Sequence, residues 1–382
     1  MSNSKNPRAY SDGPHRREES VDSVSGKPDP PSDRISTDSF DKWYKERQYR
    51  QNILEGTHYF NGPGKITPPR RLSPSKLLQC HRKTVYKQRN APEESGDPTG
   101  IYWFGTEFEE QIIVPFLQEA VVGQREYVAN SLWVDYTVET DAGELRIKGA
   151  TDPVIVTADA EPVLLTEIKT RRSIENTNAP SRRHKAQTHA YLKGLSEKYD
   201  RSISEAVILY GSRTTFDIKP FRIEFDPYFW RETVLNWAQN HAEYRLNDEL
   251  PPAEPESSWE CDYCSYSERC GKGQRQFDDI GPKGLLPGFT GYPREKLVEY
   301  LEAHDQAKLT PSLAHSHPDL ADEYGALDWK CRGCGNSVAW DAIEWDGDTS
   351  KPPQCPECVN KGSTVLVDPA PEEQLGDEKD GW

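Results

Sequence analysis

Two short apolar runs, joined by the four residues Ala158–Glu161, constrain the fold of this chain more than any other part of its sequence. The first run ends at Thr157 and the second begins at Pro162, a spacing that predicts an antiparallel β-hairpin. If these two residues pair, the same register places Asp152 opposite Glu167, with Cβ atoms about 5 Å apart. Lys169 follows Glu167 by two residues, so the two side chains share one face of the strand.

Two carboxylates and one lysine are therefore expected to converge at one end of the hairpin. Carboxylate oxygens are suitable ligands for Mg²⁺ or Mn²⁺, and such an ion makes a bound water nucleophilic and neutralises charge on a phosphate. The lysine can orient that water or stabilise a developing oxyanion. The alternative is an exposed strand end with a surface ion pair, and a register slip of one residue would separate the side chains.

Three short motifs around this hairpin carry a family resemblance. They are Gly149-x-x-Asp152, Glu167-Ile168-Lys169, and a Gln-x-x-x-Tyr motif formed by Gln187 and Tyr191. Together they resemble the signature of the RecB-like PD-(D/E)XK nucleases over roughly residues 72–272. The resemblance implies an α/β fold, namely an αβββαβ restriction-endonuclease-like core with a mixed sheet, and metal-dependent cleavage of DNA.

The resemblance also implies a role for each residue of the hairpin site. Asp152 and Glu167 would hold Mg²⁺ or Mn²⁺ together with the backbone carbonyl of Ile168, and Lys169 would position or activate the attacking water. At the position of Glu109 the family commonly has a metal-ligating histidine. A carboxylate can also bind a metal, so Glu109 is a candidate ligand, although acidic residues on a helix more often face solvent.

Gln187 and Tyr191 belong to a predicted helix, Arg182–Lys198, and their spacing of four residues places them on one face of it. Gln187 would hold a phosphate or a catalytic group, and Tyr191 would stack on a base. The alternative is that each is an ordinary surface residue of the helix.

The eight cysteines fall into two sets of four, and the Cys-x-x-Cys pattern that occurs three times predicts metal binding rather than disulfides. In the first set Cys261, Cys264 and Cys270 supply three ligands, and a closed site needs a fourth. The set resembles the iron–sulfur site of the CRISPR-associated RecB-like exonucleases, which implies Cys80 as the fourth ligand and a [4Fe–4S] cluster. Zinc is the alternative occupant, because the spacing alone suits both.

The second cysteine set predicts a zinc ribbon. Its ligands are Cys331, Cys334, Cys355 and Cys358, two Cys-x-x-Cys pairs separated by twenty residues. Residues between the pairs, Val338–Trp345, favour the strands that a ribbon needs. Such ribbons bind DNA or protein partners, and many only stabilise a small fold.

Composition divides the chain into five parts. The predicted parts are a disordered N-terminal tail at 1–36, a nuclease domain with the four-cysteine site at 37–273, a linker with a helix at 274–325, the zinc ribbon at 326–367 and an acidic tail at 368–382. Apolar spacing predicts helices at Phe40–Tyr59, Leu72–Lys87, Trp103–Val121, Tyr228–Leu246 and Pro293–His304, and strands at Ser131–Val138, Glu144–Ile147, Ala206–Gly211 and Phe221–Phe225.

The charge distribution bears on partners and location. A net charge of −16 argues against general adhesion to nucleic acid, but basic clusters such as Lys169–Arg172 and Arg182–Lys185 lie close to the predicted site. No apolar run approaches the ~20 residues that span a membrane. The chain starts with polar and charged residues, so we expect a cytoplasmic protein without a membrane partner.

The sequence thus predicts a metal-dependent DNA exonuclease with an iron–sulfur cluster and a zinc ribbon. The resemblance implies action on single-stranded ends, 5′ to 3′, in CRISPR adaptation or DNA repair, with the ribbon as a surface for partner proteins. Two alternatives stay open: a non-catalytic nucleic-acid-binding protein on a nuclease-like fold, and a zinc-held scaffold that recruits partners.

Overall fold

The structure is a computed structural model that describes residues 35–54, 66–274, 281, 283–359, 362 and 364–374. Backbone contacts divide the chain into two compact units, residues 1–61 and 62–382. In the first unit the described residues form one helix, α1 (Thr37–Leu54), at the place of the helix predicted for Phe40–Tyr59. The last five residues of that prediction lie outside the described ranges.

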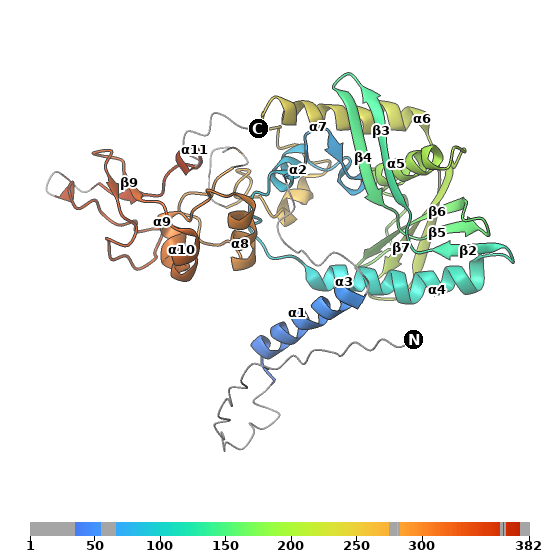
Figure 1. Cartoon of the computed structure of the whole chain (residues 1–382), viewed down its shortest axis with the longest axis horizontal. Coiled ribbons are helices and arrows are strands. Elements are labelled where there is room, and N and C mark those ends of the chain that lie inside the picture. The colour runs from blue at the N-terminus through green and yellow to red at the C-terminus, as the bar shows by residue number, and fades with distance from the viewer. Residues whose placement is uncertain are drawn as a thin grey trace, which may run out of the picture. The chain divides into compact units, whose positions relative to one another are not determined.

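The largest sheet of the second unit in the described ranges is mixed and has five strands (Figure 1). In spatial order its strands are β2 (Glu126–Ala129), β5 (Val154–Thr157), β6 (Pro162–Arg171), β7 (Glu205–Ser212) and β8 (Ile218–Glu224). Neighbouring strands are antiparallel except for β6 and β7, which are parallel. A parallel pair needs a crossover connection, and the helix α5 (Arg182–Lys198) supplies it.

The hairpin of β5 and β6 contains a bulge that the sequence did not predict. The expected pairing of Thr157 with Pro162 is wrong, because Val156 takes the place opposite Pro162. A register shift between Ile155 and Val156 then restores the expected alignment, so that Val154 pairs with Leu165. That alignment is the one required to bring Asp152 and Glu167 opposite each other.

A long helical segment covers one face of this sheet. It runs from Thr99 to Val121 through α3 (Thr99–Phe108), the π-helical turn η3 (Glu109–Ile113), α4 (Val114–Phe116) and a second π-helical turn η4 (Leu117–Val121). Phe108, Ile113 and Leu117 pack against Ile168 and Leu209 of the sheet. The predicted helix Trp103–Val121 is therefore present and begins four residues earlier.

The other face of the sheet is covered by α5 and by a helix that follows β8. This second helix comprises α6 (Pro227–Phe229), η5 (Trp230–Leu235) and α7 (Asn236–Leu246), close to the predicted Tyr228–Leu246. Ala186, Ala190 and Leu195 of α5 are completely buried in the largest apolar core of the protein.

The strands predicted at 131–138 and 144–147 belong to a separate three-stranded sheet. They are β3 (Trp133–Thr140) and β4 (Gly143–Ala150), which pair with each other and with β1 (Arg71–Leu72) in the order β1-β4-β3. The five-stranded sheet instead uses β2, which the sequence did not predict. In chain order the elements of that larger sheet are therefore a helix, the strands β2, β5 and β6, α5, and then β7.

The helix predicted at Leu72–Lys87 is interrupted. Its first part is β1 followed by a single 3₁₀ turn, η2 (Pro74–Lys76), and α2 (His81–Gln88) begins only after Cys80. Leu78 between them has a φ of 57°, a left-handed conformation that a helix does not contain.

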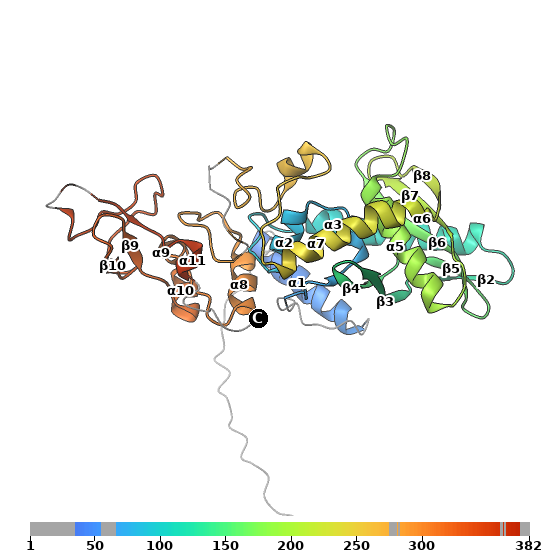
Figure 2. The same ribbon diagram turned by 90° about the horizontal axis from the view of Figure 1, so that it is seen from above.

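The C-terminal part, drawn in orange and red in Figure 2, has two small apolar cores of its own. One core gathers α8 (Arg294–Ala303), α9 (Pro311–Ser316) and α10 (Pro318–Tyr324), where the sequence predicted a single helix. The other belongs to a sheet of β10 (Ser337–Val338), β9 (Trp329–Cys331) and β11 (Leu366–Val367). The predicted strand-forming stretch Val338–Trp345 contributes only its first residue to β10.

The start of the predicted acidic tail is ordered. Asp368 is buried and accepts hydrogen bonds from the backbone N–H groups of Gly288 and Ser312. The short helix α11 (Pro371–Gln374) follows, and Gln374 bonds both the N–H and the C=O of Leu285. None of the helices in the described ranges has the length and apolar composition that crossing a membrane requires.

Candidate active site

Asp152, Glu167 and Lys169 converge at the end of the β5–β6 hairpin. Asp152 precedes β5, and its Oδ2 atom accepts a 2.7 Å hydrogen bond from the backbone N–H of Ile168. The Nζ atom of Lys169 contacts Glu167 Oε1 and lies 3.8 Å from Asp152 Oδ2. The arrangement expected from strand register is therefore present in the structure.

Glu167 is completely buried although it is an acid. Its Oε2 atom has no hydrogen-bond partner among the described residues, and Oε1 has only the ammonium of Lys169. The pKa of Glu167 is raised to about 8, mainly by burial and also by the charge of Asp152, while Lys169 opposes both effects. A buried carboxylate oxygen without a partner is costly, and a divalent cation would satisfy it. The donor set therefore fits a metal ion.

Glu109 approaches the same site from η3. Burial raises the pKa of Glu109 to about 7, and the charge of Asp152 adds to this while Lys169 opposes it. Its neighbour Glu110 is exposed. Within the described ranges the oxygens of Glu109, Asp152 and Glu167 are not all within 4.8 Å of one another. The three carboxylates therefore line the site but do not form a closed set of metal ligands.

Gln187 and Tyr191 lie on the buried face of α5. Their relative exposures are 8% and 4%, which contradicts the expectation that Tyr191 stacks on a base. The negative charges of Glu167 and Asp152 add to the effect of burial in raising the pKa of Tyr191, which places its hydroxyl near the carboxylates. A Cβ atom on Gly149 would lie 3.5 Å from this hydroxyl and 2.9 Å from Pro74 Cδ, so glycine is needed there.

The four cysteines of the first set line one pocket. Cys80 lies at the start of α2, Cys261 in the 3₁₀ helix η6 (Ser258–Tyr263), and Cys264 and Cys270 follow it. The pocket encloses about 410 Å³, part of it open to solvent, and Lys83 and Lys272 also line it. The four sulfurs are not gathered within 4.8 Å of one another.

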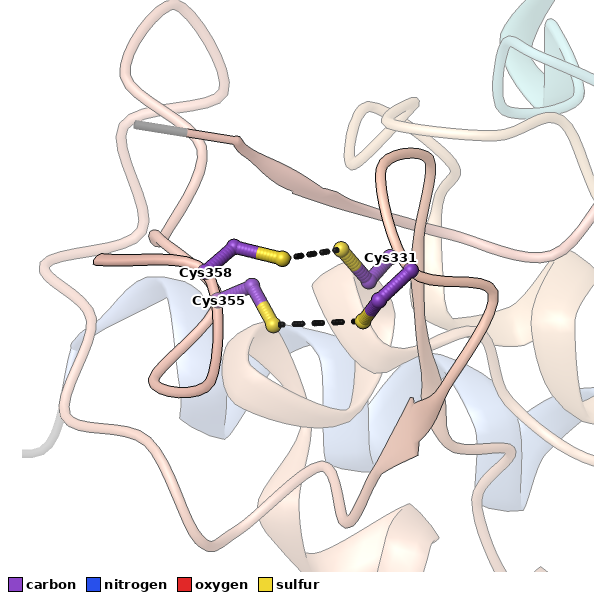
Figure 3. A group of neighbouring side chains, drawn as sticks. Cys331, Cys355 and Cys358 are labelled. Carbon is purple, nitrogen blue, oxygen red and sulfur yellow. Dashed lines mark hydrogen bonds between the residues drawn. The ribbon is translucent and has the colours of Figure 1, made fainter. Parts of the chain in front are cut away.

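The second cysteine set is much tighter (Figure 3). All four sulfurs lie within 4.8 Å of one another, with 3.8 Å between Cys331 and Cys358 and 3.9 Å between Cys334 and Cys355. Tetrahedral zinc with Zn–S bonds of about 2.3 Å requires sulfur separations of about 3.8 Å. Backbone N–H groups of Cys334 and Gly333 lower the pKa of Cys331 to about 6, which favours the thiolate that binds metal. These residues fit a zinc ion.

Sequence reasoning missed one residue at the hairpin site. The sequence predicts no role for His184 beyond the basic cluster Arg182–Lys185. In the structure its Nδ1 atom lies 2.7 Å from the hydroxyl of Tyr210 on β7. Lys169 is among the charges that lower its pKa, so the two side chains are close. One sequence feature could have indicated this residue. His184 lies three residues before Gln187, about one helical turn, so the two side chains share one side of the helix.

Comparison with known proteins agrees with this geometry. The sequence model of a family described as the PD-(D/E)XK nuclease superfamily matches residues 52–271, more than half of the chain. The chain belongs to this superfamily. The crystal structure of SSO0001 is similar to this nuclease-superfamily chain with a TM-score of 0.40 and 17% identity, over 62% of this chain and 100% of that one. No protein with a curated description matches the sequence.

Members of the PD-(D/E)XK superfamily are usually metal-dependent nucleases. The matched range includes the carboxylates and lysine of the hairpin and all four cysteines of the first set, but not the zinc-ribbon cysteines. Membership therefore indicates a nuclease that uses a divalent metal.

Proposed function

We propose that this chain is a metal-dependent DNA exonuclease whose active site is formed by Asp152, Glu167 and Lys169. The observation that carries the proposal is the fully buried Glu167, whose Oε2 atom has no partner within the described part of the chain and whose neighbours are a second carboxylate and a lysine. A structural ion pair would leave no buried oxygen unsatisfied, whereas a metal ligand must keep one available.

Asp152, Glu167, the Ile168 carbonyl and Glu109 would hold Mg²⁺ or Mn²⁺, which when bound lowers the pKa of water and neutralises charge on a phosphate. The hydrogen bond from the Ile168 N–H fixes the orientation of the Asp152 carboxylate. Gln187, which bonds Tyr191, would hold the catalytic groups in place from α5.

Lys169 acts as a positive charge and a hydrogen-bond donor. Burial lowers the pKa of Lys169, but the charges of Glu167 and Asp152 outweigh burial and leave the pKa above its usual value. An ammonium group cannot accept the proton of the attacking water. It can donate a hydrogen bond that orients this water, and it stabilises negative charge as the phosphate is attacked.

The first test is Lys169→Ala. Removal of the ammonium should lower kcat by at least about a hundredfold while folding and DNA affinity stay close to those of the unchanged protein. Cleavage is measured on labelled oligonucleotides, with EDTA to stop the reaction and Mg²⁺ or Mn²⁺ to restore it. Cleavage by the variant at the normal rate would favour the alternative, a non-catalytic nucleic-acid-binding or partner-recruiting protein on a nuclease-like fold.

We further propose single-stranded ends as the substrate, 5′ to 3′ polarity, and a place in CRISPR adaptation or DNA repair, as the resemblance to the CRISPR-associated RecB-like exonucleases implies. The basic start of α5, Arg182–Lys185, supports contact with a nucleic-acid backbone beside the site. Oligonucleotides labelled at either end, single-stranded or duplex, distinguish the polarity. Proteins of those pathways are proposed as partners of the zinc ribbon.

A [4Fe–4S] cluster is proposed for the pocket of Cys80, Cys261, Cys264 and Cys270. The wider spacing of these sulfurs supports a cluster over a single zinc, and Lys83 and Lys272 would compensate its negative charge. Protein purified without oxygen should contain about four iron and four labile sulfide per chain, plus one zinc at the ribbon. Two zinc and no iron would assign the pocket to zinc.

A further inference from the structure

Three residues of α5 form a row that faces β6. His184, Gln187 and Tyr191 are spaced by three and then four residues, so they lie on one side of the helix. Figure 1 shows α5 beside β6, the strand that carries Glu167 and Lys169. Gln187 and Tyr191 are buried, whereas His184, nearest the start of the helix, is only half-buried. His184 is therefore the member of the row that an incoming substrate can reach.

The hydrogen bonds of Tyr210 determine which ring nitrogen of His184 carries the proton. Tyr210 is completely buried, and its hydroxyl oxygen already accepts a 3.2 Å hydrogen bond from the backbone N–H of Ser181. The hydroxyl proton needs an acceptor, and His184 Nδ1 is the one available among the described residues. Nδ1 therefore accepts from Tyr210, and the neutral ring carries its proton on Nε2.

The surroundings keep this imidazole neutral. Burial lowers the pKa of His184 to about 3, and the positive charges of Lys169, Arg171 and Arg183 contribute in the same direction. The guanidinium of Arg171 lies 4.3 Å from the centre of the Tyr210 ring and holds that ring in place. Nε2 has no partner among the described residues and is not a buried atom, so its N–H is open to a ligand.

We propose that His184 is a further catalytic residue, which donates a hydrogen bond from Nε2 to a non-bridging oxygen of the phosphate being cleaved, and that Tyr210 positions it. This inference rests on the proposed nuclease function. The ligand is a phosphodiester because the charge of Lys169, which contacts Glu167, acts on His184, and the scissile phosphate would be bound beside Lys169. A neutral donor cannot lose its proton to the nearby acids, so its hydrogen bond persists as the phosphate gains charge.

A pair of substitutions separates the two nitrogens of the ring. His184→Asn keeps a polar atom near the Nδ1 position but removes the Nε2 donor, and His184→Gln places an amide N–H near the Nε2 position. We expect kcat to fall about a hundredfold in His184→Asn. In His184→Gln, kcat should be close to that of the unchanged protein, and KM should change less than kcat in both variants. Lys193→Gln, on the outer side of α5, is the control and should behave as the unchanged protein. Equal activity of His184→Asn and the unchanged protein, or an equal loss in both variants, would overturn the proposal.

A second measurement does not depend on cleavage. Ring ¹⁵N shifts of histidine-labelled protein should show the Nε2–H form of His184, assigned by its absence in His184→Gln. In Tyr210→Phe the resonance should move toward a mixture of both tautomers, and kcat should fall with it. An Nδ1–H ring in the unchanged protein would overturn the inference. If the unchanged protein and Lys169→Ala are both inactive on DNA, the proposed nuclease function is wrong. That outcome does not depend on which tautomer of His184 is observed.

Discussion

Burial determines the protonation of the site residues. Glu109 and Glu167 have pKa values of about 7 and about 8 because little water reaches them and because Asp152 lies close. In the metal-free protein near neutral pH, Glu167 is therefore mostly protonated and Glu109 about half protonated. Since their pKa values are higher in the folded than in the unfolded chain, the metal-free fold loses stability as pH rises from about 4.5 to about 8.

A pH dependence of metal binding follows from these two carboxyl groups. A divalent cation binds the ionised forms, so the metal must displace protons from Glu109 and Glu167. The apparent affinity for Mg²⁺ or Mn²⁺ should therefore fall as pH drops through about 8 and about 7. Calorimetric titration in two buffers of different ionisation enthalpy measures the protons released. An affinity that is constant across this range would contradict the placement of these acids at the metal site.

Two neighbouring glutamates provide a control for that titration. Glu109→Gln removes a ligand and should weaken metal binding by about tenfold or more, whereas the exposed Glu110→Gln should leave it unchanged.

At the scale of the elements, α5 is held between the two sheets. The hydroxyl of Tyr136 on β3 donates a 2.8 Å hydrogen bond to the carbonyl of Ala190. A Cβ atom on Gly194 would lie 2.7 Å from Tyr136 Cε1 and 2.9 Å from the Cβ of Val134. Glycine therefore permits the close approach that presents the other side of α5 to the active site.

Gly194→Ala should destabilise the protein by about 1–3 kcal/mol, because the added methyl group overlaps a buried ring. Gly100 in α3 is the matched control, since a Cβ there would contact nothing within 4 Å. Gly100→Ala should stabilise the protein by about 0.5–1 kcal/mol. Urea unfolding measures both changes. Similar effects of the two substitutions would mean that α5 does not approach β3 as closely as the structure shows.

The segment that carries the first cysteine set also contacts the start of α5. Arg182 lies 3.8 Å from Glu256, and Arg183 lies 3.5 Å from Glu260, the residue before Cys261. A metal centre bound in the cysteine pocket would thus hold the helix end that carries His184.

At the scale of the whole molecule, buried cations connect the nuclease part to the C-terminal helices. Arg269 is completely buried and donates to the carbonyls of Gly281, Lys283 and Gly284. Lys296 of α8 is 6% exposed at its side chain and contacts Glu93 at 3.2 Å and Asp97 at 2.7 Å. These contacts argue that residues 283–303 are anchored to the nuclease part and do not act as a free linker.

Lys296→Met should lower the free energy of unfolding by about 1–3 kcal/mol, because the half-buried Glu93 loses its nearer cation and keeps only Lys87, whose Nζ atom lies 3.4 Å away. Arg294→Met on the same helix removes an exposed ion pair with Asp319 and should cost less than about 1 kcal/mol. Thermal unfolding of the full chain measures both. If the two variants unfold alike, the contact between α8 and the nuclease part contributes nothing to stability.

The sequence alone determined what depends on near neighbours along the chain. The period of two in β6 placed Glu167 and Lys169 on one face, and helical spacing placed Gln187 and Tyr191 together on α5. Two close Cys-x-x-Cys pairs indicated a ribbon whose sulfurs the structure brings within 4.8 Å. These features follow from backbone geometry over a few residues, so no knowledge of the rest of the fold is needed to predict them.

Only the tertiary structure decided which distant segments meet and how deeply each group is buried. It paired β3 and β4 in a sheet of their own, and it joined Cys80 to cysteines more than a hundred and eighty residues away. The raised pKa of Glu167 and the hydrogen bond between His184 and Tyr210 depend on side chains from several elements. Strand partners and the loss of water are properties of the packed molecule, and no local pattern encodes them.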